Sequence, residues 1–260
     1  MATVTSTAAD IARDVLDHLL HRIDVTPAME EPFGHIYLQE VFPSDIYAEI
    51  LASLPDPSIY AITAERHHKG EAGSYNRSLF PIAVQNLRLM STSIRDLWRG
   101  IAAGLTAPEL KRAMYAKLAR DLAFRYGVPE SKAAELPGYS RPTLYRETEG
   151  FEIPPHPDTR KKVITMHLYF PADLSQLDLG TALYRRKRPA LPFGDWRRRF
   201  EKMKQFPFRP NSGYAFVVNN KIIRKSWHGR EELPPGTGVR NTLLNTYYEA
   251  PRDGFDGYLA

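Results

Sequence analysis

The pattern of apolar positions changes near the middle of the chain. In the first half, apolar residues recur every three or four positions, the spacing of a helix with one buried face. This spacing is clearest in residues 8–23, which we predict to form a helix buried through Ile11, Val15, Leu19 and Ile23. The same pattern predicts further helices over residues 43–54, 82–105 and 108–126, the last ended by Gly127.

From about Gly138 the pattern is that of short β-strands separated by Gly, Pro and Asp. The predicted strands cover residues 143–145, 163–170, 181–184, 213–218, 222–227 and 241–248. Many short strands without intervening helices favour an antiparallel sandwich or jelly roll. We therefore predict one α+β domain over residues 1–260. In this domain a helical N-terminal segment, residues 1–137, packs outside a β core, residues 138–250, and the core carries an insert, residues 185–211.

Composition narrows the possible chemistry. The chain has 260 residues, of which 43% are hydrophobic and 25% are charged, as in ordinary globular proteins. Cysteine is absent, which excludes disulfides, zinc–thiolate sites, iron–sulfur clusters and thiol nucleophiles. The N-terminus does not have the pattern of a signal peptide, and no apolar run approaches the roughly 20 residues that span a bilayer. We expect a cytoplasmic protein without a membrane anchor.

The net charge of +5 is concentrated in the insert 185–211. Within it, residues 196–204 have a helix-like pattern. The basic side chains are Arg185, Arg186, Lys187, Arg188, Arg197, Arg198, Arg199, Lys202 and Lys204. A solvated surface is the simplest interpretation, and guidance of an anionic substrate is another. Nucleic acid is an unlikely partner, because the aromatic residues that stack on bases are sparse in this segment.

The segment Pro155-His156-Pro157-Asp158 is the first candidate for chemistry. In extended backbone, residues i and i+2 point to the same side, so His156 and Asp158 can face one metal ion. Short motifs of this kind also occur by chance, and a loop in which Asp158 caps a turn explains the pair equally well.

Two further residues follow in the β-rich half. His228 lies 72 residues after His156, at the end of a β-rich run. Arg240 lies twelve residues after His228 and enters the apolar strand Asn241–Tyr248. A buried guanidinium requires an anionic partner, which is either an internal carboxylate or a bound ligand.

Together, His156-x-Asp158, His228 and Arg240-x-Thr242 resemble the iron(II)- and 2-oxoglutarate-dependent oxygenases of the prolyl-hydroxylase-like group. Gly150 and the small-residue run Gly180–Leu183 add to the resemblance. It implies a double-stranded β-helix, or jelly roll, in which His156, Asp158 and His228 hold Fe(II). It also implies that Arg240, Thr242 and Tyr145 bind the distal carboxylate of 2-oxoglutarate. With O₂ as second cosubstrate, such an enzyme hydroxylates or otherwise oxidises an unactivated C–H of a small polar metabolite, and releases succinate and CO₂.

Other interpretations remain open. A cupin-type metal-binding jelly roll, acting as an isomerase or a sugar-binding module, would keep the histidines without needing Arg240. A nucleic-acid-binding protein would use the basic insert. The polar stretch 65–77, which contains His67 and His68, is predicted to be a loop that closes over substrate. The identity of the substrate and the oligomeric state cannot be predicted from these patterns.

Overall fold

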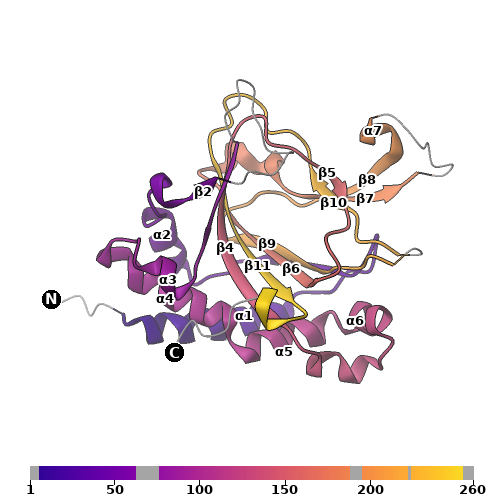
Figure 1. Ribbon diagram of the computed structural model, residues 1–260, viewed down its shortest axis with the longest axis horizontal. Coiled ribbons are helices and arrows are strands. Elements are labelled where there is room, and N and C mark those ends of the chain that lie inside the picture. The colour runs from indigo at the N-terminus through magenta and orange to yellow at the C-terminus, as the bar shows by residue number, and fades with distance from the viewer. Residues whose placement is uncertain (1–5, 63–75, 188–194, 222–223, 254–260) are drawn as a thin grey trace.

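Most of the helices gather on one side of the molecule, and the longest of them is α1 (Ala8–Val25). The computed structural model describes residues 6–62, 76–187, 195–221 and 224–253 (Figure 1). Thr7 and Asp10 form a capping box at the start of α1, and the four predicted apolar residues are buried. In the described segments, no helix is both long and apolar enough to cross a membrane. The other α-helices are α2 (Ser44–Ala52), α3 (Val84–Leu87), α4 (Thr92–Thr106), α5 (Pro108–Lys117), α6 (Ala119–Tyr126) and α7 (Trp196–Arg199).

Both of the longer predicted helices are divided in two. The pattern over residues 82–105 becomes α3 and α4, and the pattern over residues 108–126 becomes α5 and α6. The second break is at Leu118, whose φ of −106° and ψ of 24° depart from helical values. Gly127 ends α6 as predicted, in the left-handed conformation with φ of 69°, which glycine adopts without steric cost.

The strands form two antiparallel sheets. The seven-stranded sheet has the order β1-β9-β6-β11-β4-β3-β2, and the four-stranded sheet has the order β5-β10-β7-β8. The strands are β1 (His35–Gln39), β2 (Ala61–Ile62), β3 (Arg77–Pro81), β4 (Tyr139–Glu147), β5 (Ile153–His156), β6 (Lys162–Phe170), β7 (Ala182–Arg186), β8 (Phe200–Gln205), β9 (Ser212–Val217), β10 (His228–Arg230) and β11 (Arg240–Tyr248). The connections also contain the 3₁₀ turns η1 (Pro57–Ile59), η3 (Glu130–Glu135), η4 (Leu174–Leu179) and η5 (Pro251–Asp253).

Several predicted boundaries were wrong. The segment of residues 1–137 is not only helical, because β1 pairs with β9 and β3 pairs with β4 in the seven-stranded sheet. In the insert 185–211, the helix stops at Arg199, and the chain continues as β8 along the edge of the four-stranded sheet. Residues 65–75, 188–194 and 222–223 lie outside the described residues. In the described part of the strand predicted over residues 222–227, Lys225 forms only an isolated bridge with Asn220, and the next strand, β10, begins at His228.

The two faces of the seven-stranded sheet differ in character. Along β6, Ile164, Met166 and Leu168 belong to the core that packs against the helices. The alternate residues, including Thr165 and His167, point to the opposite face, towards the four-stranded sheet. The same division applies to β11, where Leu243 packs towards the helices and Arg240 and Leu244 line a cavity. The fold therefore places a row of buried polar side chains between the two sheets.

Candidate metal centre

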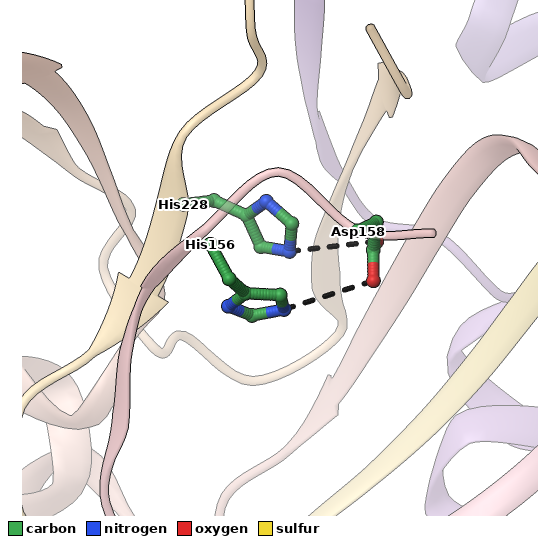
Figure 2. A group of neighbouring side chains, drawn as sticks. All are labelled: His156, Asp158 and His228. Carbon is green, nitrogen blue, oxygen red and sulfur yellow. Dashed lines mark ion pairs between the residues drawn. The ribbon is translucent and has the colours of Figure 1, made fainter. Parts of the chain in front are cut away.

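The four-stranded sheet brings the two predicted histidines together. His156 ends β5, His228 begins β10, and the two residues are paired across these strands. Their rings lie side by side, with centroids 4.4 Å apart (Figure 2). The neighbouring Gly229 permits this approach, because a Cβ atom there would lie 2.5 Å from the carbonyl oxygen of Ile153.

Asp158 faces both imidazoles from the loop after β5 (Figure 2). Its Oδ1 lies 3.6 Å from Nε2 of His156, and its Oδ2 lies 3.5 Å from Nε2 of His228. One ligand atom from each of the three residues lies within 4.8 Å of the others. The backbone at Asp158 has φ of 56°, an uncommon conformation that Asp tolerates better than most residues. The predicted triad therefore converges on one point.

The backbone fixes which nitrogen of each ring faces Asp158. Nδ1 of His156 lies 3.1 Å from the carbonyl oxygen of Pro154, and Nδ1 of His228 lies 2.9 Å from that of Ser226. A carbonyl oxygen only accepts, so each Nδ1 donates, and Nε2 of each ring faces Asp158. Burial, aided by His156, lowers the pKa of His228 to about 3, so this ring is neutral at pH 7.

The lone pair of Nε2 of neutral His228 is directed at the carboxylate of Asp158, a repulsive contact unless a cation lies between the two groups. The three donors, two neutral imidazoles and one carboxylate, are those that bind Fe(II) in non-haem oxygenases. The donated Nδ1 hydrogens are also the usual outer contacts of metal-binding histidines. The donor set thus fits a divalent transition metal.

Strand β6 holds the carboxylate of Asp158 from its other side. Nζ of Lys162 lies 2.7 Å from Oδ1, and Oγ1 of Thr165 donates to Oδ2 at 3.0 Å. Burial alone would raise the pKa of Asp158, but Lys162, His228 and His156 outweigh it and hold this pKa well below 3.8. Neither Lys162 nor Thr165 was predicted from the sequence. They lie four and seven residues after Asp158, on the strand that follows the turn, and this closeness in sequence was the available sign that they contact its carboxylate.

A cavity of about 90 Å³ opens beside the triad, between the two sheets. Both cationic and anionic side chains line it. Among the three candidate metal ligands His156 is the most exposed, with 39% of its side-chain surface accessible. The residues lining it are Arg77, Glu147, Ile153, His156, Asp158, Lys162, Thr165, His167, Thr181, Tyr214, His228, Gly229, Arg230, Arg240 and Leu244.

Arg240 lines this cavity and already has an internal partner. Its Nη1 donates to Oε2 of Glu147 at 2.5 Å, and its Nε donates to the carbonyl oxygen of Leu179 at 2.8 Å. The internal carboxylate that a buried guanidinium requires is therefore present. The third nitrogen, Nη2, is buried and has no hydrogen-bond partner among the described residues.

Glu147 is surrounded by three arginines. Besides Arg240, Nε of Arg77 lies 3.2 Å from Oε1 and Nε of Arg230 lies 3.7 Å from Oε2. Burial would raise the pKa of Glu147, but the three guanidinium groups, Arg240 foremost, lower it below its ordinary value. One carboxylate thus meets three cations, and this end of the cavity is electropositive.

Thr242 and Tyr145 occupy paired positions beside Arg240. Thr242 lies on β11 between Arg240 and Leu244, which both line the cavity, so strand alternation directs its side chain to the same face. Its Oγ1 is fully buried and has no hydrogen-bond partner in the described segments of the chain. Tyr145 is the cross-strand partner of Thr242, and the guanidinium of Arg77 covers its ring at 4.2 Å. Of these three predicted cosubstrate-binding residues, only Arg240 lines the cavity directly.

Comparison with known proteins gives structural neighbours only. No family model matches the chain, and no curated protein matches its sequence. A prolyl-4-hydroxylase from Pseudomonas putida is 11% identical, with a TM-score of 0.42, over 92% of this chain and 99% of that one.

Two other solved structures are similar at the same level. The α-ketoglutarate-dependent epimerase SnoN from nogalamycin biosynthesis is 12% identical, with a TM-score of 0.47, over 90% of this chain and 83% of that one. HygX from Streptomyces hygroscopicus, solved with nickel and 2-oxoglutarate, is 12% identical, with a TM-score of 0.41, over 88% and 85%. All three TM-scores lie below 0.5, and the function proposed below rests on the site itself.

Proposed function

We propose that this chain is an Fe(II)- and 2-oxoglutarate-dependent oxygenase. The observation that carries the proposal is the convergence of Nε2 of His156 and His228 on the carboxylate of Asp158, with both rings oriented by backbone carbonyls. Two imidazoles and one carboxylate leave coordination positions open for other ligands. Iron bound there, with 2-oxoglutarate and O₂, supplies the oxidation of a C–H bond and yields succinate and CO₂.

We infer that the eight strands β4 to β11 form the double-stranded β-helix of such enzymes. Numbered along the chain from β4, they pair in the orders 1-8-3-6 and 2-7-4-5. Two facing antiparallel sheets with these crossovers are the arrangement of a jelly roll. The metal ligands then lie on its second and seventh strands and the adjoining loop, and Arg240 begins the eighth.

The Arg240 end of the cavity is suited to the distal carboxylate of 2-oxoglutarate. Nη2 of Arg240 and Oγ1 of Thr242 are buried donors without partners among the described residues, and leaving such groups unpaired costs free energy. A carboxylate bound there would accept hydrogen bonds from both donors and would offset some of the excess positive charge around Glu147. Tyr145, next to Thr242, is proposed as a further hydroxyl donor.

The substrate, we propose, is a small polar molecule that approaches over His156, the exposed edge of the triad. Hydroxylation of an unactivated C–H is the proposed outcome. In this arrangement His228 and Asp158, both buried side chains, would hold the metal. His156 completes the site at the mouth of the cavity.

The proposal is tested by turnover. Purified protein with Fe(II) and ascorbate should convert 2-oxoglutarate to succinate, and His156→Ala or His228→Ala should abolish the conversion. His21→Ala is a matched control, because that histidine is exposed on α1. Iron-loaded protein that forms no more succinate than a heat-killed sample, across a panel of candidate substrates, would overturn the proposal.

The salt bridge between Arg240 and Glu147 also favours a second candidate, a cupin-type isomerase or sugar-binding module that needs no dicarboxylate. Thermal unfolding separates the two, because a ligand that binds only the folded state raises its stability. Metal-dependent stabilisation by N-oxalylglycine, an analogue of 2-oxoglutarate, supports the oxygenase. Indifference to this compound in the metal-loaded protein supports the cupin.

A further inference from the structure

The carboxylate of Asp158 has one partner from β6 on each of its oxygens. Lys162 contacts Oδ1 at 2.7 Å, and Thr165 contacts Oδ2 at 3.0 Å. Both contacts are shielded, since the side chains of Asp158 and Lys162 are only 6% and 21% exposed. The two partners differ in one property, because Thr165 is a neutral donor and Lys162 is a cation.

This difference gives the two partners opposite effects on a bound metal. A neutral hydroxyl that donates to a metal-binding carboxylate orients it and leaves its negative charge available. The ammonium of Lys162, whose Nζ lies 2.7 Å from Oδ1, neutralises that charge and repels a divalent cation nearby. This repulsion is stronger at a partly buried site than in bulk water, because the site has a lower dielectric constant. Lys162 therefore competes with a metal for the carboxylate that Thr165 orients.

Lys162 has no other carboxylate to pair with in the described lining of the cavity. That lining contains one further carboxylate, Glu147, and Glu147 is already in contact with three arginines. The hydroxyls of Tyr145 and Tyr248 and the imidazole of His228 also act on Lys162 electrostatically, but none of them is a carboxylate. When a metal takes the charge of Asp158, the ammonium therefore loses its counter-ion.

We propose that Lys162 is the built-in counter-cation of the metal-binding carboxylate. It keeps Asp158 paired while no metal is bound and lowers the affinity for metal, whereas Thr165 positions the carboxylate and raises that affinity. This inference rests on the proposed function, because it concerns the same metal centre. It assigns opposite roles to two residues that contact the same side chain.

The test measures the affinity of the full-length protein for Co(II) by isothermal titration calorimetry at one fixed pH. Lys162→Met should bind Co(II) about tenfold more tightly or better, because the competing charge is removed. Thr165→Val should bind it about 10- to 100-fold more weakly, the usual cost of losing an outer contact of a ligand. Lys162→Arg keeps the charge and should retain the original affinity.

Lys161→Met is the matched control. Lys161 is the adjacent lysine, but it is 64% exposed and pairs with Asp253 instead of the triad. Its loss removes the same formal charge and should leave the affinity for Co(II) unchanged. Near-ultraviolet circular dichroism establishes that each variant is folded, and the visible spectrum of bound Co(II) establishes that the coordination is preserved.

The outcomes are distinct. If both Lys162→Met and Thr165→Val weaken binding, or if Lys162→Met has no effect, Lys162 has a merely structural role and the inference is overturned. If the unaltered protein binds one Co(II) but produces no succinate, the proposed function fails while the inference is still decided by these affinities. If the unaltered protein binds no metal, both are overturned.

Discussion

Arg240 and Glu147 form an ion pair that is almost completely removed from solvent, with Nη1 and Oε2 2.5 Å apart and each side chain about 1% exposed. The two residues are cross-strand partners at the start of β11 and the end of β4. Glu147 thus orients the guanidinium through Nη1, and Nη2 of the same group has no hydrogen-bond partner among the described residues.

Arg240→Gln should weaken binding of N-oxalylglycine about 10- to 100-fold, the effect of losing a charge-assisted hydrogen bond. It should also lower the free energy of unfolding by up to about 3–5 kcal/mol, because Glu147 loses its shortest contact. The double variant Arg240→Gln/Glu147→Gln should regain some of this stability but none of the affinity. Calorimetric titration and urea unfolding measure the two effects separately. Unchanged affinity in the single variant would remove Arg240 from the cosubstrate site.

Acid should destabilise the metal-free protein through His167. This residue is buried, and its Nδ1 lies 3.1 Å from the hydroxyl of Tyr214. Burial, followed by the charges of Arg240, Arg77 and Arg230, holds its pKa well below 6.5. The His167 ring therefore stays neutral in the folded state, whereas in the unfolded chain it takes up a proton as the pH falls through about 6.5. Above that pH the group is neutral in both states and does not affect stability, and below it the free energy of unfolding falls.

The expected slope from this single group approaches about 1.4 kcal/mol per pH unit below pH 6.5. Urea unfolding in the presence of a chelator, at several values between about pH 7.5 and 5, measures it. His228, with a pKa of about 3, contributes in the same direction. His167→Gln should flatten the dependence relative to the original protein, and an equally steep dependence in this variant would contradict the assignment.

Gly229→Ala should separate the two histidines of the candidate metal centre. The added Cβ would lie 2.5 Å from the carbonyl oxygen of Ile153, so β10 must move away from β5 and carry His228 with it. We expect weaker Co(II) binding, by at least about tenfold, together with lower stability. Gly236→Ala is the control. Gly236 has a φ of 76°, which is unfavourable for alanine, but an added Cβ would meet no described atom of another part of the chain within 4 Å. The Gly236→Ala variant should be less stable but should bind Co(II) as tightly as the original protein. Equal Co(II) affinities in the two variants would contradict the prediction.

Features specified by nearby residues were predictable from the sequence. Helix α1 follows from its four-residue apolar spacing and its capping residues, and β6 and β11 follow from dense apolar runs. His156, Asp158 and His228 were predicted from their spacing and residue types, and the structure brings them together. The resemblance to known oxygenases supplied the connection between the distant histidines.

Features specified by distant partners were not predictable. The basic composition of Phe200–Gln205 suits a helix, but the segment lies at a sheet edge where pairing with β7 determines its conformation. Likewise, β1 has a strand partner more than 170 residues away in the sequence. The roles of Glu147 and Lys162 depend on which cations and carboxylates the fold places beside them, which no local pattern shows.

The alternation along β6 and β11 has a consequence for how accurately the geometry of the candidate metal centre is reproduced each time the chain folds. A shift of one residue in the pairing register of either strand would point His167 or Arg240 into the apolar core between the sheet and the helices. The same shift would point Leu168 or Leu243 into the cavity. Such a misaligned state is penalised on both surfaces of the sheet at once. The apolar packing around α1 and α4, remote from the candidate metal centre, thereby selects the one alignment in which the groups proposed to bind metal meet.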